Sequence, residues 1–290
     1  MEGGSGGPVG ERTGSSSGAT YALRHNRPCN HEDIIFCIDI DRQSQADMKV
    51  TGAKGRPITR LDAIKQAILL FLHAKLRMNP NHRFAFSALS HSASWATTFP
   101  VSASFPAPPL LFGRFSVIRR EFSGDVDLAL SALRSISADL SYDQADLSQL
   151  FKMAAYEGRR CRAQSRILRV ILIYCRSSVQ PEFHWPEGQK LFTLDVLYLH
   201  DKPSPDNCPQ KVYDTLVDAL EHVGEHEGYI FESGGGLTRV LFKQMCLLLS
   251  HPQQRCSQED LDIPKSVTKK VPVTEGHPVK EEETPHGSNQ

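Results

Sequence analysis

DIIFCIDID, residues Asp33–Asp41, is the stretch that decides the fold of this chain. It is a continuous apolar run that ends in two carboxylates, Asp39 and Asp41. Such runs are typical of strands buried on both faces of a parallel sheet. Acidic residues just past the carboxyl end of a central strand lie where open α/β sheets bind ligands and metals. The stretch therefore predicts an α/β fold and a candidate site at Asp39.

Strands and helices alternate along the rest of the chain. Apolar or alternating runs predict further strands at 83–90, 93–98, 166–175, 191–199 and 229–231. Helical periodicity predicts helices at about 59–77, 125–137, 144–158, 210–224 and 237–250. The alternation predicts a doubly wound, mostly parallel sheet of about six strands with helices on both faces. Asp195 falls inside a buried strand, so we expect it to have a hydrogen-bond partner.

The composition of the chain limits the classes of function that it can have. The chain has 290 residues and a formal net charge of +0, which argues against nucleic-acid binding as the main role. No apolar stretch approaches the length needed to cross a bilayer, and the N-terminus lacks the basic and apolar runs of a signal peptide. The 7 cysteines lie mostly inside apolar runs, which indicates reduced thiols. We expect a protein of the nucleus and cytoplasm.

The chain is expected to hold one domain, at residues 31–256, between two tails. Residues 1–30 are rich in Gly and Ser, and residues 257–290 are rich in Lys, Glu and Pro, so both are predicted to be disordered. Residues 99–117 are rich in Pro and Phe and have no helical or strand period. Proline cannot lie in a central strand. This segment is therefore predicted to be an irregular insertion that the domain does not need in order to fold.

The first possible site at Asp39 is a Mg²⁺ site of the von Willebrand factor A type. In that family the first strand runs into Asp-x-Ser-x-Ser, whose hydroxyls share the metal shell with water and carboxylates. Asp39 matches the first ligand, but Asp41 and Gln43 stand at the serine positions. Arg176 falls where a later Asp is expected and would bring a cation near the metal. The sequence thus predicts a degenerate site that binds no metal and no cofactor.

The second possible site is that of the haloacid-dehalogenase phosphatases, whose first strand ends in Asp-x-Asp. Asp39 would then be the nucleophile and Asp41 the general acid and base. Gln43 and Ser44 do not suit that family's motif. A simpler interpretation is that both carboxylates accept hydrogen bonds from nearby backbone amides, and we favour it.

A partner surface is predicted on the last helix and the segment after it. One apolar stripe can dock this helix on the sheet, and a second stripe lies well round from the first. A surface helix with two apolar stripes is expected to be covered by another protein, although the second stripe could instead pack under the helix at 210–224. Pro252 ends the helix and predicts an extended segment with Arg255 as its polar anchor. The predicted partner-binding residues are Phe242, Cys246, Leu249, His251, Pro252 and Arg255.

Six stretches resemble, in order, the von Willebrand A-like subunits of the BRISC and BRCA-A deubiquitinase complexes. They are residues 34–39, 84–89, 146–151, 171–183, 192–200 and 247–255. The most specific are Tyr-x-Arg-x-x-x-Gln-Pro from Tyr174 and His-Pro-x-Gln-Arg from His251. The chain departs from the family at 99–117, which has no counterpart there, and in lacking a long acidic N-terminal region.

The resemblance implies a non-catalytic scaffold without a metal site. It implies membership of an arch-shaped complex in which a zinc-dependent subunit cleaves polyubiquitin, with a role in DNA-damage repair. The direct neighbour would be the ubiquitin-E2-variant subunit, the brain and reproductive organ-expressed protein. No direct contact with nucleic acid or membrane is expected.

Overall fold

The computed structural model describes residues 31–49, 57–96, 122–138, 140–185 and 190–261. Three sequence predictions lie outside the described residues. They concern the N-terminal tail at 1–30, the insertion at 99–117 and the C-terminal tail beyond residue 261.

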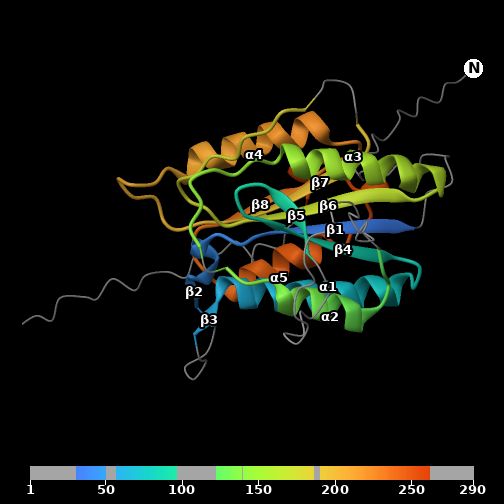
Figure 1. Cartoon of the computed structure of the whole chain (residues 1–290), viewed down its shortest axis with the longest axis horizontal. Helices are drawn as coiled ribbons and strands as arrows, with labels where there is room; N and C mark the ends of the chain where they lie inside the picture. The colour runs from blue at the N-terminus through green and yellow to red at the C-terminus, as the bar shows by residue number, and fades with distance from the viewer. Residues whose placement is uncertain (1–30, 50–56, 97–121, 139, 186–189, 262–290) are drawn as a thin grey trace, which may run out of the picture.

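A six-stranded sheet forms the centre of the described structure, in the order β5-β4-β1-β6-β7-β8 (Figure 1). Its strands are β1 (Glu32–Asp39), β4 (Arg83–Leu89), β5 (Ala93–Trp95), β6 (Ile167–Tyr174), β7 (Thr193–Leu199) and β8 (Ile230–Ser233). All neighbours pair in parallel except β4 and β5, which form an antiparallel hairpin. A separate pair, β2 (Asp47–Met48) and β3 (Ile58–Thr59), precedes the first helix. Every residue of β1 is buried, as its unbroken apolar run requires.

Helices cover both faces of the sheet (Figure 1). On one face lie α1 (Arg60–Met78), α2 (Val126–Ser135) and α5 (Thr238–Leu247). On the other lie α3 (Ser148–Ala163) and α4 (Pro209–Val223). The predicted doubly wound α/β fold is therefore confirmed. None of the described helices combines the length and the apolar character needed to cross a membrane.

The start of α1 follows from local chemistry. The Thr59 hydroxyl accepts a hydrogen bond from the backbone N–H of Asp62 at 3.1 Å and so caps the helix. The buried face of α1 then packs on the sheet, where Phe71 meets Phe36 edge to face with ring centroids 5.5 Å apart. This packing holds the carboxyl end of β1 and the start of α1 at the same edge of the sheet.

The predicted bounds of the third helix are wrong. The helix was expected at 144–158, yet α3 begins at Ser148 and continues to Ala163. Gly158 suggests a helix end, but it lies inside α3. A Cβ at this position would come within 2.4 Å of the carbonyl oxygen of Leu191, so no larger residue fits there. A close approach of two backbones, and not a turn, requires this glycine.

The end of the domain also differs from the prediction. After α5 the chain forms two 3₁₀ turns, η2 (Pro252–Gln254) and η3 (Gln258–Asp260), in place of a free extended segment. Leu261 packs against the hydrophobic core. The folded unit therefore continues past the expected boundary at 256, because the segment after α5 has buried contacts of its own.

Candidate functional site

Asp39 and Arg176 form a buried ion pair at the carboxyl ends of β1 and β6. Both side chains are 0% exposed. The guanidinium donates from Nε and Nη2 to the Asp39 carboxylate at 3.0–3.2 Å. The backbone N–H groups of Asp41 and Cys175 donate to the same carboxylate at 3.1 and 3.0 Å. Burial raises the pKa of Asp39, whereas the guanidinium and the two amides favour its charged form.

The remaining donors of Arg176 hold the surrounding loops. The guanidinium donates to the carbonyl oxygens of Ser90 and Gln144, and more weakly to Leu89 at 3.4 Å. Its carbon lies 5.5 Å from the centre of the Tyr142 ring. One cation therefore joins the end of β4 and the loop before α3 to Asp39.

Asp41 and Gln43 lie in the same loop after β1, and both bind backbone amides. Asp41 accepts from the N–H groups of Gln43 and Tyr142, each at 2.8 Å. The side-chain oxygen of Gln43 accepts from the N–H of Ser177 at 2.9 Å. The four residues of the predicted degenerate site are thus brought together, in the amide-binding roles that we favoured for the two carboxylates.

Arg60 occupies the neighbouring part of the carboxyl edge of the sheet and bonds to the carbonyl groups there. The sequence did not reveal this role. Its Nη1 donates to the carbonyl oxygens of Gln43, Cys175 and Leu199 at 3.1–3.2 Å. Its Nη2 pairs with Asp201 at 2.8 Å. The carbonyls at the ends of β6 and β7 thus find a partner inside the chain.

An Mg²⁺ ion does not fit this set of residues. The Asp39 carboxylate already accepts five hydrogen bonds, three of them from a cation, and a guanidinium would repel a metal at the same oxygens. Among the described residues, no group of three or more His, Cys, Asp or Glu side chains could hold a metal ion. A surface cavity of about 510 Å³ opens beside the site, but the Asp41 and Asp201 carboxylates in its wall are already bonded within the chain.

The phosphatase interpretation requires Asp39 to attack a phosphorus atom. Its carboxylate is fully buried and covered by Arg176, so neither oxygen faces solvent. That family also needs an acidic pair after a later strand, and His200 and Asp201, which follow β7, are engaged elsewhere. His200 stacks on Tyr198 with ring centroids 4.7 Å apart, and Asp201 pairs with Arg60. The geometry of the described residues does not support phosphoryl transfer at Asp39.

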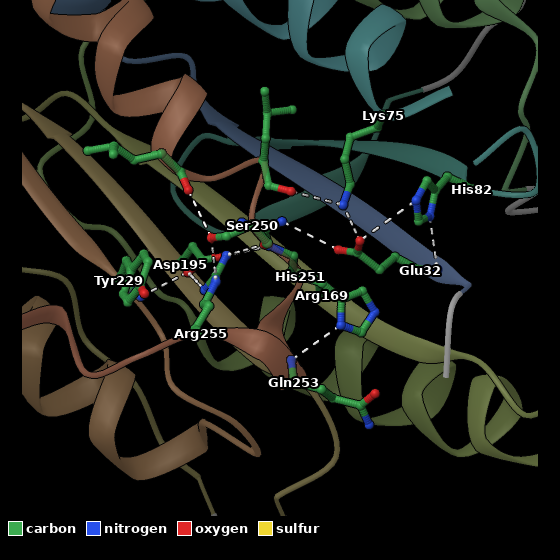
Figure 2. A network of polar contacts seen from close by, with 12 residues as sticks. Glu32, Lys75, His82, Arg169, Asp195, Tyr229, Ser250, His251, Gln253 and Arg255 are labelled. Atoms are coloured by element: carbon green, nitrogen blue, oxygen red, sulfur yellow. Dashed lines mark hydrogen bonds and ion pairs between the residues drawn. The ribbon is translucent and has the colours of Figure 1, made fainter. Parts of the chain in front are cut away.

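A second buried polar cluster lies between the sheet and the segment after α5 (Figure 2). Three cations, Lys75, Arg169 and Arg255, meet two carboxylates, Glu32 and Asp195. Lys75 donates to Glu32 and Arg169 donates to Asp195 at 2.5 Å. Burial opposes ionisation of both carboxyl groups, but the adjacent cations hold the pKa of Glu32 and of Asp195 below their usual values. Burial also lowers the pKa of Lys75.

Asp195 has the hydrogen-bond partners expected of a carboxylate inside a strand. Arg255 donates to its two oxygens at 2.6 and 3.1 Å, and the N–H of Tyr229 donates at 2.8 Å. The Arg255 guanidinium also lies 4.4 Å from the centre of the Tyr229 ring. The Arg255 side chain is 0% exposed, so it binds within the chain and does not have the exposed anchor position predicted for it.

The other predicted partner residues divide into two groups. Cys246 is exposed, and Phe242 and Leu249 are half-buried against the hydrophobic core. The helix that could have covered this stripe, α4, lies on the opposite face of the sheet (Figure 1). Pro252 is buried and His251 is half-buried in the segment after the helix. The α5 stripe is thus the part of the predicted surface that remains open.

Sequence reasoning missed Glu32, Lys75 and Arg169. A usable signal existed for Arg169, which is a charged residue inside the most apolar strand, next to the strand that carries Asp195. Lys75 falls on the apolar stripe of its helix, but a lysine late in an amphipathic helix ordinarily extends its amine to solvent, so its ion pair was not expected.

Sequence comparison finds relatives along most of the chain. It is 22% identical over 242 residues to "BRISC and BRCA1-A complex member 1" of Xenopus tropicalis, covering 81% of this chain and 70% of that protein. It is 22% identical over 235 residues to the Homo sapiens protein of the same name, covering 78% of this chain and 66% of that protein. No protein-family profile matches the chain.

Solved structures with a similar fold include the VWA domain of SpRpn10, with a TM-score of 0.43 and 12% identity, covering 78% of this chain and 98% of that one. The N-terminal domain of TFIIH p34 has a TM-score of 0.42 and 14% identity, covering 74% of this chain and 95% of that one. In sequence, the chain is similar to proteins named as members of the BRISC and BRCA1-A complexes.

Proposed function

We propose that this protein is a non-catalytic scaffold subunit of a BRISC or BRCA1-A type deubiquitinase complex. The observation that carries the proposal is the closure of the ligand-binding edge by Arg176 and Arg60. Both guanidiniums bond within the chain to groups that a metal or substrate would otherwise contact. A rigid, internally satisfied fold suits a subunit that positions its neighbours and performs no chemistry. The similarity to complex members supports the same role.

The finer proposals rest on the resemblance alone. The direct partner would be the ubiquitin-E2-variant subunit, the brain and reproductive organ-expressed protein, which connects this chain to a zinc-dependent deubiquitinase. The complex would cleave polyubiquitin in DNA-damage repair, in the nucleus and cytoplasm. We further propose that the partner covers the stripe of Phe242, Cys246 and Leu249 on α5 and just after it, because Cys246 is exposed and the two flanking side chains are half-buried.

The test is capture of the purified ubiquitin-E2-variant subunit by the full-length chain. Cys246→Arg places a charge at an exposed position and should leave the fold intact while reducing capture at least about tenfold. Asp218→Arg on α4 is the matched control, because that position is also exposed but lies on the opposite face of the sheet. Equal capture by parent, Cys246→Arg and control would place the interface elsewhere. Failure of the parent to capture the subunit would reject this partner.

A further inference from the structure

β8 is the last strand of the sheet and has β7 on one side only. The carbonyl oxygens of Tyr229 and Ser233 accept hydrogen bonds from Val196 and His200, so they face β7. The backbone N–H and C=O groups of successive strand residues point to alternate sides. The backbone groups of Ile230 and Glu232 therefore face away from β7 and the rest of the sheet. An edge of this kind is a template on which another strand can pair.

Two glutamine side chains occupy this open edge. The Gln258 amide accepts from the N–H of Ile230 and donates to its carbonyl oxygen, both at 2.7 Å. It thus makes both bonds that a residue of a neighbouring strand would make. The Gln244 amide donates to the carbonyl oxygen of Glu232 at 2.8 Å. Three of the four outward backbone groups of Ile230 and Glu232 are therefore bonded to side chains.

Gln258 is held in place by residues 251–261, which we call the C-terminal strap. Arg255 fixes the strap through its paired hydrogen bonds to Asp195 and its position over the Tyr229 ring (Figure 2). The Tyr229 hydroxyl donates to the carbonyl oxygen of Cys256 at 2.9 Å. The N–H of Gln258 donates to the Glu227 carboxylate at 3.1 Å. The strap is thus attached just before its cap residue, at Arg255 and Cys256, and at the backbone of the cap residue itself.

We infer that the C-terminal strap is an internal edge cap that prevents strand addition to β8, with Gln258 as the cap and Arg255 as its attachment. The strand that it excludes is the β8 of a second copy of this chain, whose outward groups at Ile230 would become unpaired in the same way once its own Gln258 was removed. An amide side chain is an effective cap because it satisfies the donor and the acceptor of one residue without extending the ladder. This inference does not depend on the proposed function.

The experiment compares Gln258→Ala with Gln254→Ala in the full chain. Gln254 is the matched control, because it is an exposed glutamine of the same strap. Hydrogen exchange is measured at the Ile230 amide, and molar mass is measured by light scattering over a range of concentrations. In Gln258→Ala we expect exchange at Ile230 to become at least about tenfold faster and dimers to form with rising concentration. The control should match the parent in both measurements.

Unchanged exchange at Ile230 in Gln258→Ala would overturn the inference. Faster exchange without self-association would overturn the blocking role. Should Gln258→Ala fail to fold, Gln258→Glu replaces it, since it keeps an acceptor for the Ile230 amide but loses the donor. Arg255→Met tests the attachment and should speed exchange at Ile230 and at the Gln258 amide together. Exchange at both amides as slow as in the parent would show that Arg255 does not hold the strap.

Discussion

At the residue scale, the ion pair of Asp39 and Arg176 determines what the carboxyl edge of the sheet can do. A buried charge without its partner is much more costly than a buried pair. The two residues are separated by 137 positions in the sequence, and their contact joins the two central strands at their ends. The pair should therefore contribute to stability as a unit.

Arg176→Met should lower the free energy of unfolding by about 3–5 kcal/mol, because it leaves the Asp39 carboxylate buried with only backbone donors. Adding Asp39→Asn should recover part of this loss, since the remaining side chain is neutral. Urea denaturation of the parent, both single variants and the double variant measures the coupling. Additive losses in the double variant would show that the pair does not act as a unit.

His82 should make stability depend on pH between its normal and its folded pKa. Its Nδ1 accepts from the N–H of Glu32 at 3.1 Å, and burial together with Lys75 lowers its pKa from 6.5 to about 4. In this window the unfolded chain binds a proton that the folded chain does not, so stability falls as pH decreases. The His82 contribution to that loss is on the order of 2–3 kcal/mol.

The comparison variant is His82→Asn, which keeps an acceptor near Glu32 but cannot titrate. Its unfolding free energy should fall less than that of the parent between pH 6.5 and 4.5, as measured by urea denaturation at each pH. The same slope in both proteins would assign the pH dependence to other groups. Below this window the lowered pKa values of Glu32, Asp33 and Asp195 should cause further loss in both proteins, as these carboxylates become protonated.

At the element scale, α3 can pack on the sheet only if one of its positions has no side chain. Gly158→Ala would normally stabilise a helix by about 1 kcal/mol. Here the added Cβ meets the carbonyl oxygen of Leu191, which is backbone and cannot rotate away. We expect a net loss of about 1–3 kcal/mol in thermal or urea unfolding.

Ser131→Ala is the control for helix propensity, because Ser131 is exposed inside α2. This variant should be neutral or slightly stabilised. A stabilised Gly158→Ala protein would mean that α3 and the segment before β7 that carries Leu191 can move apart at no cost.

At the scale of the whole molecule, the fold should need no metal ion. A ligand that binds the folded state raises the melting temperature with its concentration. Because Arg176 already supplies the cation at Asp39, neither Mg²⁺ nor a chelator should shift the melting temperature by more than about 1 °C. Differential scanning calorimetry with and without millimolar Mg²⁺ measures this. A saturable rise that Asp39→Ala abolishes would show that the site binds metal after all.

The sequence by itself determined the α/β architecture and the position of the candidate site at Asp39. The apolar run at 33–41 and the alternation of strand and helix periods are local patterns, and local patterns set which faces are buried. The residue types at Asp41, Gln43 and Arg176 were enough to argue against a metal shell. The need of Asp195 for a partner also followed from its burial alone.

Only the tertiary structure decided which partners these charged groups take. Arg255 was predicted to face another protein, and the fold turns it inward onto Asp195. Arg60 and Lys75 lie at positions of α1 that sequence periodicity cannot assign to an ion pair. Gly158 resembles a helix end until Leu191 is placed beside it. Each of these contacts joins residues far apart in the chain, so it depends on strand order and helix position, which no local pattern encodes.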